Sequence, residues 1–138
     1  MVIGLSHVAI VVPDLAAATR KLADLYGLAV GETRVNEREG VRLAYVDLGN
    51  AKIELIEPSR AGTATAKFLE RNPRGGIHHL CLSVDDAVAT ERQFAACGAR
   101  FTGDGTPRLS VHGERIAFIH PQDFLGALVE IEERRSIA

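Results

Sequence analysis

The segment that decides the fold lies at residues 75–86 and reads GGIHHLCLSVDD. A related segment near the N-terminus, at residues 6–14, reads SHVAIVVPD. A shift of 72 residues places His7 on His79 and keeps the apolar and acidic positions of the two segments in step. The chain therefore contains two copies of one structural unit.

Each copy of the repeated segment has the period-two pattern of a β-strand, in which alternate side chains point to opposite faces. One face is apolar and is expected to face a core: Val8, Ile10, Val12 and Leu80, Leu82, Val84. The other face begins with a histidine and continues with smaller residues: His7, Ala9, Val11 and His79, Cys81, Ser83. This second face is interpreted as the wall of a cavity.

The order of elements repeats along the chain. In the first copy a strand at 3–12 precedes a helix that begins after Asp14 and ends at Gly27, and strands follow at 28–35, 41–48 and 51–56. In the second copy a strand at 77–84 precedes a helix capped near Asp85 or Asp86 and closed by Gly98, and strands follow near 99–102, 114–119 and 127–132. The pattern predicts an α+β fold in which two βαβββ modules form a curved, cup-like mixed sheet with helices outside. We expect a single domain, 1–138, with modules at about 1–58 and 76–138 joined by a short helical connection.

Composition excludes several classes of function. The 138 residues are 46% hydrophobic, which is enough to bury a core, and 16 Lys+Arg against 18 Asp+Glu give a net charge of -2. This balance predicts neither a nucleic-acid partner nor an anionic membrane surface. The sequence shows no signal peptide and no apolar run long enough for a membrane span, so we expect a cytoplasmic protein. Cys81 and Cys97 are interpreted as reduced thiols.

Each copy also places one acid between apolar residues on its last strand: Glu54 in the first and Glu130 in the second. A buried carboxylate is costly unless it is paired or binds a cation. Two such acids and the two repeated histidines predict one divalent metal ion, held by His7, Glu54, His79 and Glu130 and formally neutral with them. Mixed nitrogen and oxygen ligands suit cobalt, nickel, manganese, iron or zinc.

Simpler interpretations exist for each of these residues. A single strand histidine is more often a core or surface residue than a ligand, and it is the repeat that favours the metal interpretation. Isolated strand acids usually face solvent, which is the expectation for Glu57, Glu132 and Glu133. Cys81 is interpreted as a small residue that lines the cavity.

The repeated unit together with His7, His79 and Glu130 resembles the vicinal oxygen chelate superfamily, which includes glyoxalases, bleomycin resistance proteins and dioxygenases. Within it, the sequence is similar to the methylmalonyl-CoA epimerase family over nearly the whole chain. The similarity is carried by five stretches: LGNAKIELIEP at 48–58, AKFLERN at 66–72, GGIHH at 75–79, VHGERIAFIHP at 111–121 and LVEIE at 128–132.

The resemblance implies a metal-dependent enzyme that interconverts (2R)- and (2S)-methylmalonyl-CoA. The C2 proton would be removed and returned through a metal-stabilised enolate, with Glu130 as the first catalytic residue. The expected cofactor is one divalent ion, Co²⁺ first, with Mn²⁺, Ni²⁺, Zn²⁺ and Fe²⁺ as alternatives. The expected small-molecule partner is the CoA thioester, with Lys67 and His112 as substrate-binding residues and Arg71 or Arg74 as alternatives to Lys67 near the CoA phosphates. A second copy of the chain in a homodimer is also expected.

The sequence departs from some members of this family at two positions. Leu43 stands where they carry a glutamate, and Glu54 stands where they carry a glutamine ligand. Glu54 is therefore a candidate for both metal binding and catalysis. A neighbouring histidine, such as His112 or His120, or a metal-bound water is the alternative second base.

Other functions of the superfamily remain as alternatives. A glyoxalase I-type lyase would use the same metal ligands and also remove a proton next to a carbonyl. An extradiol dioxygenase would use two histidines and one glutamate, so Glu54 argues against it. A drug-sequestering protein would need no metal, so the four ligand residues argue against that function.

Overall fold

The computed structural model describes residues 1–104 and 106–134, which belong to two compact units. Unit 2 comprises His7–His78. Unit 1 comprises Met1–Ser6 and the chain from His79 onward.

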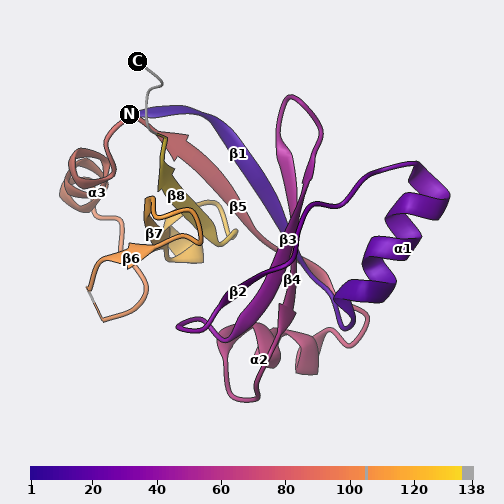
Figure 1. Ribbon diagram of the computed structural model, residues 1–138. Coiled ribbons are helices and arrows are strands. Elements are labelled where there is room, and N and C mark those ends of the chain that lie inside the picture. Colours follow the sequence, from indigo (N-terminus) through magenta and orange to yellow (C-terminus); the bar gives the residue numbers. More distant parts are fainter. Residues whose placement is uncertain (105, 135–138) are drawn as a thin grey trace. The chain divides into compact units, whose positions relative to one another are not determined.

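The order of elements confirms an α+β fold with two βαβββ modules (Figure 1). The first module contains β1 (Val2–Val11), α1 (Leu15–Tyr26), β2 (Arg34–Asn36), β3 (Val41–Asp47) and β4 (Lys52–Pro58). The helix α2 (Ala64–Arg71) follows as the expected connection. The second module contains β5 (Gly76–Val84), α3 (Ala87–Ala96), β6 (Arg108–Leu109), β7 (Arg115–Ile119) and β8 (Val129–Glu133), with the short 3₁₀ helix η1 (Pro121–Asp123) before β8.

In unit 2 the strands lie in the order β2-β3-β4-β1. The pairs β2–β3 and β3–β4 are antiparallel, whereas β4 and β1 are parallel. The helix α1 lies to one side of these strands (Figure 1). Its apolar residues pack on one sheet face in a core that contains Ile10, Val12, Leu15, Ala18, Leu22, Val30, Ala44, Ile53 and Leu55. The opposite strand face is thereby left to carry His7 and Glu54.

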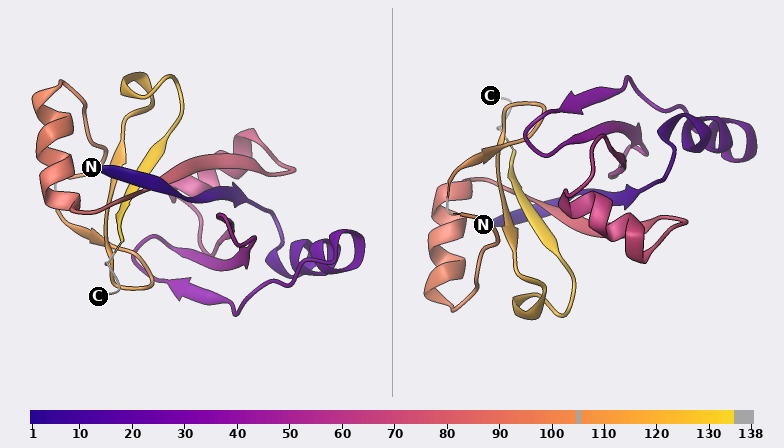
Figure 2. Two further views of the ribbon diagram at one scale, coloured as in Figure 1. Left: turned by 90° about the horizontal axis from the view of Figure 1, so that it is seen from above. Right: turned by 90° about the horizontal axis from the view of Figure 1, so that it is seen from below.

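In unit 1 the order is β5-β8-β7-β6, with β5 and β8 parallel and the other two pairs antiparallel. Both views in Figure 2 show α3 alongside β7 and β8. The core on this face is built from Val84, Ala87, Ile119, Val129 and Ile131, and Leu80, Leu82 and Phe94 pack against it. The expected alternation of two faces along each first strand is confirmed in both modules, and the histidine face is the more buried one, since Val8, Ile10, Leu80 and Leu82 on the apolar face are half-buried.

Both long helices begin in the same way. The side chains of Asp14 and Asp86 accept hydrogen bonds from Ala17 N (2.9 Å) and Ala89 N (2.8 Å) and so cap α1 and α3. The helix that was expected to begin near Asp85 or Asp86 therefore takes Asp86 as its cap.

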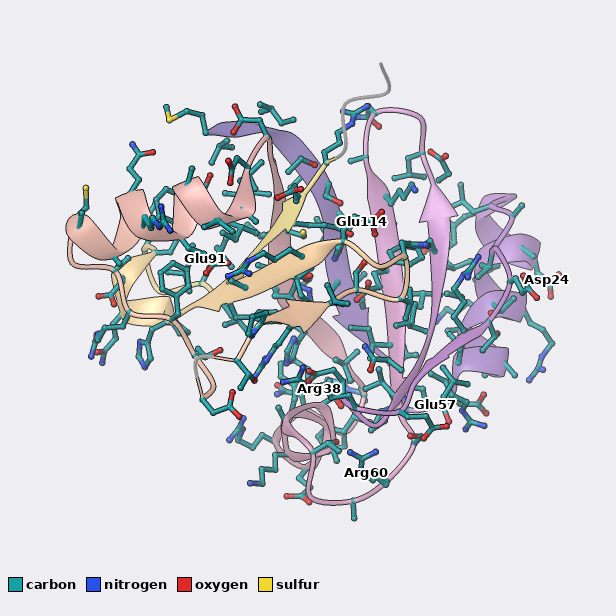
Figure 3. All side chains as sticks on the ribbon, turned by 60° about the vertical axis from the view of Figure 1, so that its left-hand side comes forward. Asp24, Arg38, Glu57, Arg60, Glu91 and Glu114 are labelled. Atoms are coloured by element: carbon teal, nitrogen blue, oxygen red, sulfur yellow. The ribbon has the colours of Figure 1, made fainter. Side chains whose placement is uncertain are left out.

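A second carboxylate holds each helix start. Glu57 lies at the end of β4 (labelled in Figure 3) and accepts from Leu15 N (2.7 Å). Glu133 at the end of β8 accepts from Ala87 N (3.0 Å). The expectation that these glutamates face solvent is wrong, because both are half-buried against a helix N-terminus, where negative charge is favourable. Since Glu54 lies three residues before Glu57 on the strand, its side chain points to the opposite face.

Two expected strands are shorter than the sequence pattern indicates. Within the expected strand 28–35, only the last two residues belong to a strand, β2. Before β2, Gly31 N donates a hydrogen bond to Tyr45 O (2.9 Å), but the residues around it do not form a ladder with β3. Of 99–102, only the bridge between Phe101 and Ile119 remains, and the edge position beside β7 is taken by β6. Near the end of α1, Leu25 is 68% exposed.

The first glycine of the deciding segment, Gly75, has a steric reason. Gly75 has φ +85°, and a Cβ atom there would lie 2.3 Å from the backbone oxygen of Val11. Only glycine allows this close approach immediately before β5.

The sequence predicted no membrane-spanning segment and two reduced thiols. Among residues 1–104 and 106–134, the helices lack the length and apolar character needed to cross a bilayer. Cys81 is buried in β5, Cys97 is exposed at the end of α3, and the two do not form a disulfide.

Candidate metal and proton-transfer site

Unit 2 brings His7 and Glu54 together. His7 lies on β1 and Glu54 on the neighbouring parallel strand β4, where Ala9 is the register partner of Glu54. The side chains of His7 and Glu54 are 3% and 8% exposed, and His7 Nε2 lies 3.6 Å from Glu54 Oε2. A buried imidazole and a buried carboxylate thus face each other, as the alternation of both strands predicts.

Tyr45 is a third member of this group, and sequence reasoning missed it. It lies on β3 directly opposite Glu54, and its hydroxyl donates a short hydrogen bond to Glu54 Oε2. The Tyr45 ring also meets the His7 ring edge-on, with centroids 5.7 Å apart. A tight turn, in which Leu48 N donates to Ala51 O (3.0 Å), sets the β3–β4 register that pairs Tyr45 with Glu54.

Unit 1 repeats the arrangement with His79 and Glu130. His79 lies on β5 and Glu130 on the parallel strand β8, where Cys81 is its register partner. The side chains of His79 and Glu130 are 3% and 7% exposed, and His79 Nε2 lies 2.8 Å from Glu130 Oε2. The second copy therefore carries its own buried histidine–carboxylate pair.

The two units differ at the residue opposite the acid. Phe118 on β7 is the register partner of Glu130, and its ring meets the His79 ring edge-on at 5.2 Å. Phe118 thus occupies the place that Tyr45 occupies in unit 2, but a phenylalanine ring offers no hydroxyl. The guanidinium of Arg108 on β6 lies over the Phe118 ring, with its carbon atom 5.8 Å from the ring centroid.

Glu132 and Cys81 form a polar group beside the unit 1 pair. Ser6 donates its hydroxyl to Glu132 Oε2 (3.0 Å), and Cys81 Sγ lies 3.7 Å from the same oxygen. The expectation that Glu132 faces solvent is therefore wrong: it is half-buried and hydrogen-bonded. Cys81 is fully buried, and its interpretation as a small residue of a cavity wall stays a prediction.

The residues expected to meet substrate lie on the surface. Lys67 is exposed on α2, and His112 is exposed in the turn between β6 and β7, where its backbone N–H donates to Ser110 Oγ (3.2 Å). Leu43, in contrast, is buried at 5% exposure on the same face of β3 as Tyr45. It lies opposite Ile56, one side-chain position along the strand from Glu54.

The chemistry of the two pairs fits a divalent cation. Each unit offers one imidazole nitrogen and one carboxylate oxygen in a buried setting. First-row divalent ions accept such mixed ligands, and a buried carboxylate is stabilised by a neighbouring cation. Candidate metal-binding side chains are therefore present in both units.

Comparisons with known proteins identify the family of the chain. The family model described as the Glyoxalase/Bleomycin resistance protein/Dioxygenase superfamily matches residues 6–118. Ethylmalonyl-CoA/methylmalonyl-CoA epimerase of Cereibacter sphaeroides is 44% identical over 133 residues, which cover 96% of this chain and 99% of that protein. Human mitochondrial methylmalonyl-CoA epimerase is 36% identical over 94% of this chain and 73% of its own length.

Solved structures show the same relationship. Methylmalonyl-CoA epimerase from Mycobacterium tuberculosis superposes with a TM-score of 0.89 at 34% identity, over 98% of this chain and 90% of that one. A methylmalonyl-CoA epimerase in complex with methylmalonyl-CoA and NH₄⁺ gives a TM-score of 0.88 at 32% identity, over 99% of this chain and 98% of the other. The chain belongs to the glyoxalase/bleomycin resistance protein/dioxygenase superfamily and, within it, to the methylmalonyl-CoA epimerase family.

Proposed function

We propose that this protein is an epimerase that interconverts (2R)- and (2S)-methylmalonyl-CoA. The observation that carries the proposal is the repeated buried pair, His7 with Glu54 and His79 with Glu130, in a chain whose relatives are epimerases of this thioester. The Cereibacter sphaeroides relative is named for both ethylmalonyl-CoA and methylmalonyl-CoA, so we include ethylmalonyl-CoA among the substrates to test.

The metal centre is part of the proposal. We infer that His7, Glu54, His79 and Glu130 together hold one divalent cation, with Co²⁺ as the first candidate. The burial of all four side chains and their donor atoms support this assignment. When bound, the cation would supply positive charge to offset the substrate carboxylate and the charge that develops on the thioester oxygen.

The protein side chains would move the proton. In this proposal a carboxylate oxygen of Glu130 removes the C2 proton on one face of the substrate. The carboxyl group of Glu54 returns a proton on the opposite face, which inverts C2. Glu54 takes the second role because Leu43 occupies the place of the family glutamate and carries no group that can bind a proton.

Binding of the CoA portion and assembly complete the proposal. Lys67 and His112 are exposed and polar, which suits contact with the phosphates and amides of a CoA chain. We also propose that the protein forms a homodimer and that it works in the cytoplasm. Sedimentation analysis tests the dimer, and localisation of the tagged protein tests the compartment.

A turnover assay tests the function directly. The metal-loaded protein is incubated with pure (2S)-methylmalonyl-CoA, and the two epimers are separated by chiral analysis. We expect the (2R) epimer to accumulate until the two epimers reach chemical equilibrium. Turnover of the methylglyoxal–glutathione hemithioacetal, with the CoA ester unchanged, would instead identify a glyoxalase I-type lyase.

A further inference from the structure

The two modules place the same kinds of residue around their acids but differ at one position, where unit 2 has Tyr45 and unit 1 has Phe118. We propose that Tyr45 is a positioning residue of the metal centre, which fixes the carboxylate of Glu54 for cation binding through its hydroxyl. This inference rests on the proposed function, because it assigns a role within that centre.

The hydrogen bond from Tyr45 reaches the Glu54 oxygen that faces His7. Tyr45 donates to Glu54 Oε2, and the same oxygen lies 3.6 Å from His7 Nε2. A carboxylate oxygen has two lone pairs, so one can accept from the hydroxyl while the other points to a cation. Glu54 Oε2 can therefore be oriented by Tyr45 and still act as a ligand beside His7.

The position of Tyr45 is fixed by the fold. Tyr45 and Glu54 are directly opposed on the antiparallel strands β3 and β4, and the tight turn between these strands sets their register. The Tyr45 ring is also packed edge-on against His7, at an interplanar angle of 74°. One side chain therefore contacts both unit 2 ligands and restricts their rotamers.

The contrast with unit 1 explains why the hydroxyl is needed in unit 2. Glu130 Oε2 lies 2.8 Å from His79 Nε2, whereas the corresponding distance from Glu54 to His7 is 3.6 Å. The longer separation leaves the Glu54 carboxylate less constrained by its histidine. The hydrogen bond from the Tyr45 hydroxyl supplies the missing constraint on the Glu54 carboxylate. In unit 1, Phe118 packs its ring against His79 and has no hydroxyl to donate to Glu130.

The test removes one oxygen atom from each tyrosine of the chain in turn. Tyr45→Phe deletes the hydroxyl that reaches Glu54, and Tyr26→Phe deletes a hydroxyl from the exposed end of α1 as the matched control. Co²⁺ affinity is measured by competition with a chelator, and the visible absorption of the Co²⁺ form reports its coordination. We expect Tyr45→Phe to weaken Co²⁺ binding by about 10- to 100-fold and to alter the spectrum. Tyr26→Phe should match the parent in both.

A double-mutant cycle shows whether Tyr45 acts through Glu54. The loss of Co²⁺ affinity caused by Tyr45→Phe should largely vanish when Glu54 is already replaced by Ala, because alanine offers no oxygen to accept the hydrogen bond from the hydroxyl. Equal losses in both backgrounds would overturn the inference. Circular dichroism and the unfolding midpoint show that each variant is folded, and an unfolded Tyr45→Phe variant would contradict a role limited to positioning.

The parent protein separates failure of this inference from failure of the proposed function. A folded parent that binds no divalent cation overturns both. A parent that binds Co²⁺ and epimerises the thioester, with Tyr45→Phe indistinguishable from it in affinity and spectrum, overturns only the role of Tyr45.

Discussion

His7 and His79 are the residues on which the proposed metal centre depends most directly. Each is buried, each lies on the first strand of its module, and each faces a buried glutamate. Since the two side chains occupy equivalent positions in the repeat, removing either one should have the same effect.

We expect His7→Ala and His79→Ala each to lower bound metal below one equivalent and to abolish epimerase turnover. Circular dichroism should show the folded protein in both cases. His78→Ala is the matched control, because His78 adjoins a proposed ligand in sequence but packs its ring against Phe68 of α2, 5.2 Å away. Full metal stoichiometry and activity in either ligand variant would contradict the four-residue centre.

Glu54 carries two proposed roles that one substitution can separate. Glu54→Gln keeps an amide oxygen for the cation but cannot transfer a proton, so the variant should retain metal and lose turnover by at least about 100-fold. Leu43 lies on β3, the strand next to β4, opposite Ile56 and one side-chain position from Glu54. Adding Leu43→Glu supplies a new carboxylate there and should recover part of the rate. Unchanged turnover in metal-loaded Glu54→Gln would leave Glu54 as a ligand only and direct attention to His112.

At the scale of elements, the glutamates that end β4 and β8 connect each sheet to its helix. Glu133 accepts a hydrogen bond from Ala87 N at the start of α3, which is one of the helix N–H groups without a partner inside the helix. Glu133→Ala should therefore lower the free energy of unfolding by about 1 kcal/mol. Urea unfolding measures this loss, and Glu70→Ala on the exposed surface of α2 should show much less.

The ion pair between Arg100 and Asp123 ties the segment after α3 to η1. Hydrogen bonds from the Arg100 side chain and backbone lower the pKa of Asp123. Because this carboxyl has a lower pKa folded than unfolded, it stabilises the protein at neutral pH, and the contribution is lost as the pH falls through the acid range.

Asp123→Asn should consequently weaken the acid dependence of the urea midpoint and reduce stability mainly at neutral pH. Asp24→Asn, at an exposed position on α1, serves as the control for removing one negative charge. If parent and Asp123→Asn lose stability in parallel between neutral pH and acid pH, the pair does not contribute as described.

Local signals in the sequence were sufficient for most elements. Asp14, Asp86 and Gly27 mark helix ends because caps depend on one side chain or one left-handed residue. The strands expected at 28–35 and 99–102 were too long. A strand forms only where a neighbouring strand hydrogen-bonds to it, and the sequence of one segment does not show where its partner begins and ends.

At the scale of the whole molecule, the repeat was the most informative feature of the sequence. It predicted two βαβββ modules, and strand alternation placed each histidine and its acid on matching faces. The repeat could not identify Tyr45, because the two modules differ at this position. It also could not identify Glu57 and Glu133 as helix-binding residues, because these contacts join elements about 40 residues apart.

The fate of the C2 proton tests the proposed function most directly. Metal-loaded protein is incubated with (2S)- or (2R)-methylmalonyl-CoA in deuterated water, and mass spectrometry is combined with chiral analysis of the two epimers. Because the proton is removed and returned by different groups on opposite faces, we predict that the newly formed epimer carries deuterium at C2. Retained configuration without label, in folded and metal-loaded protein, would contradict the epimerase assignment.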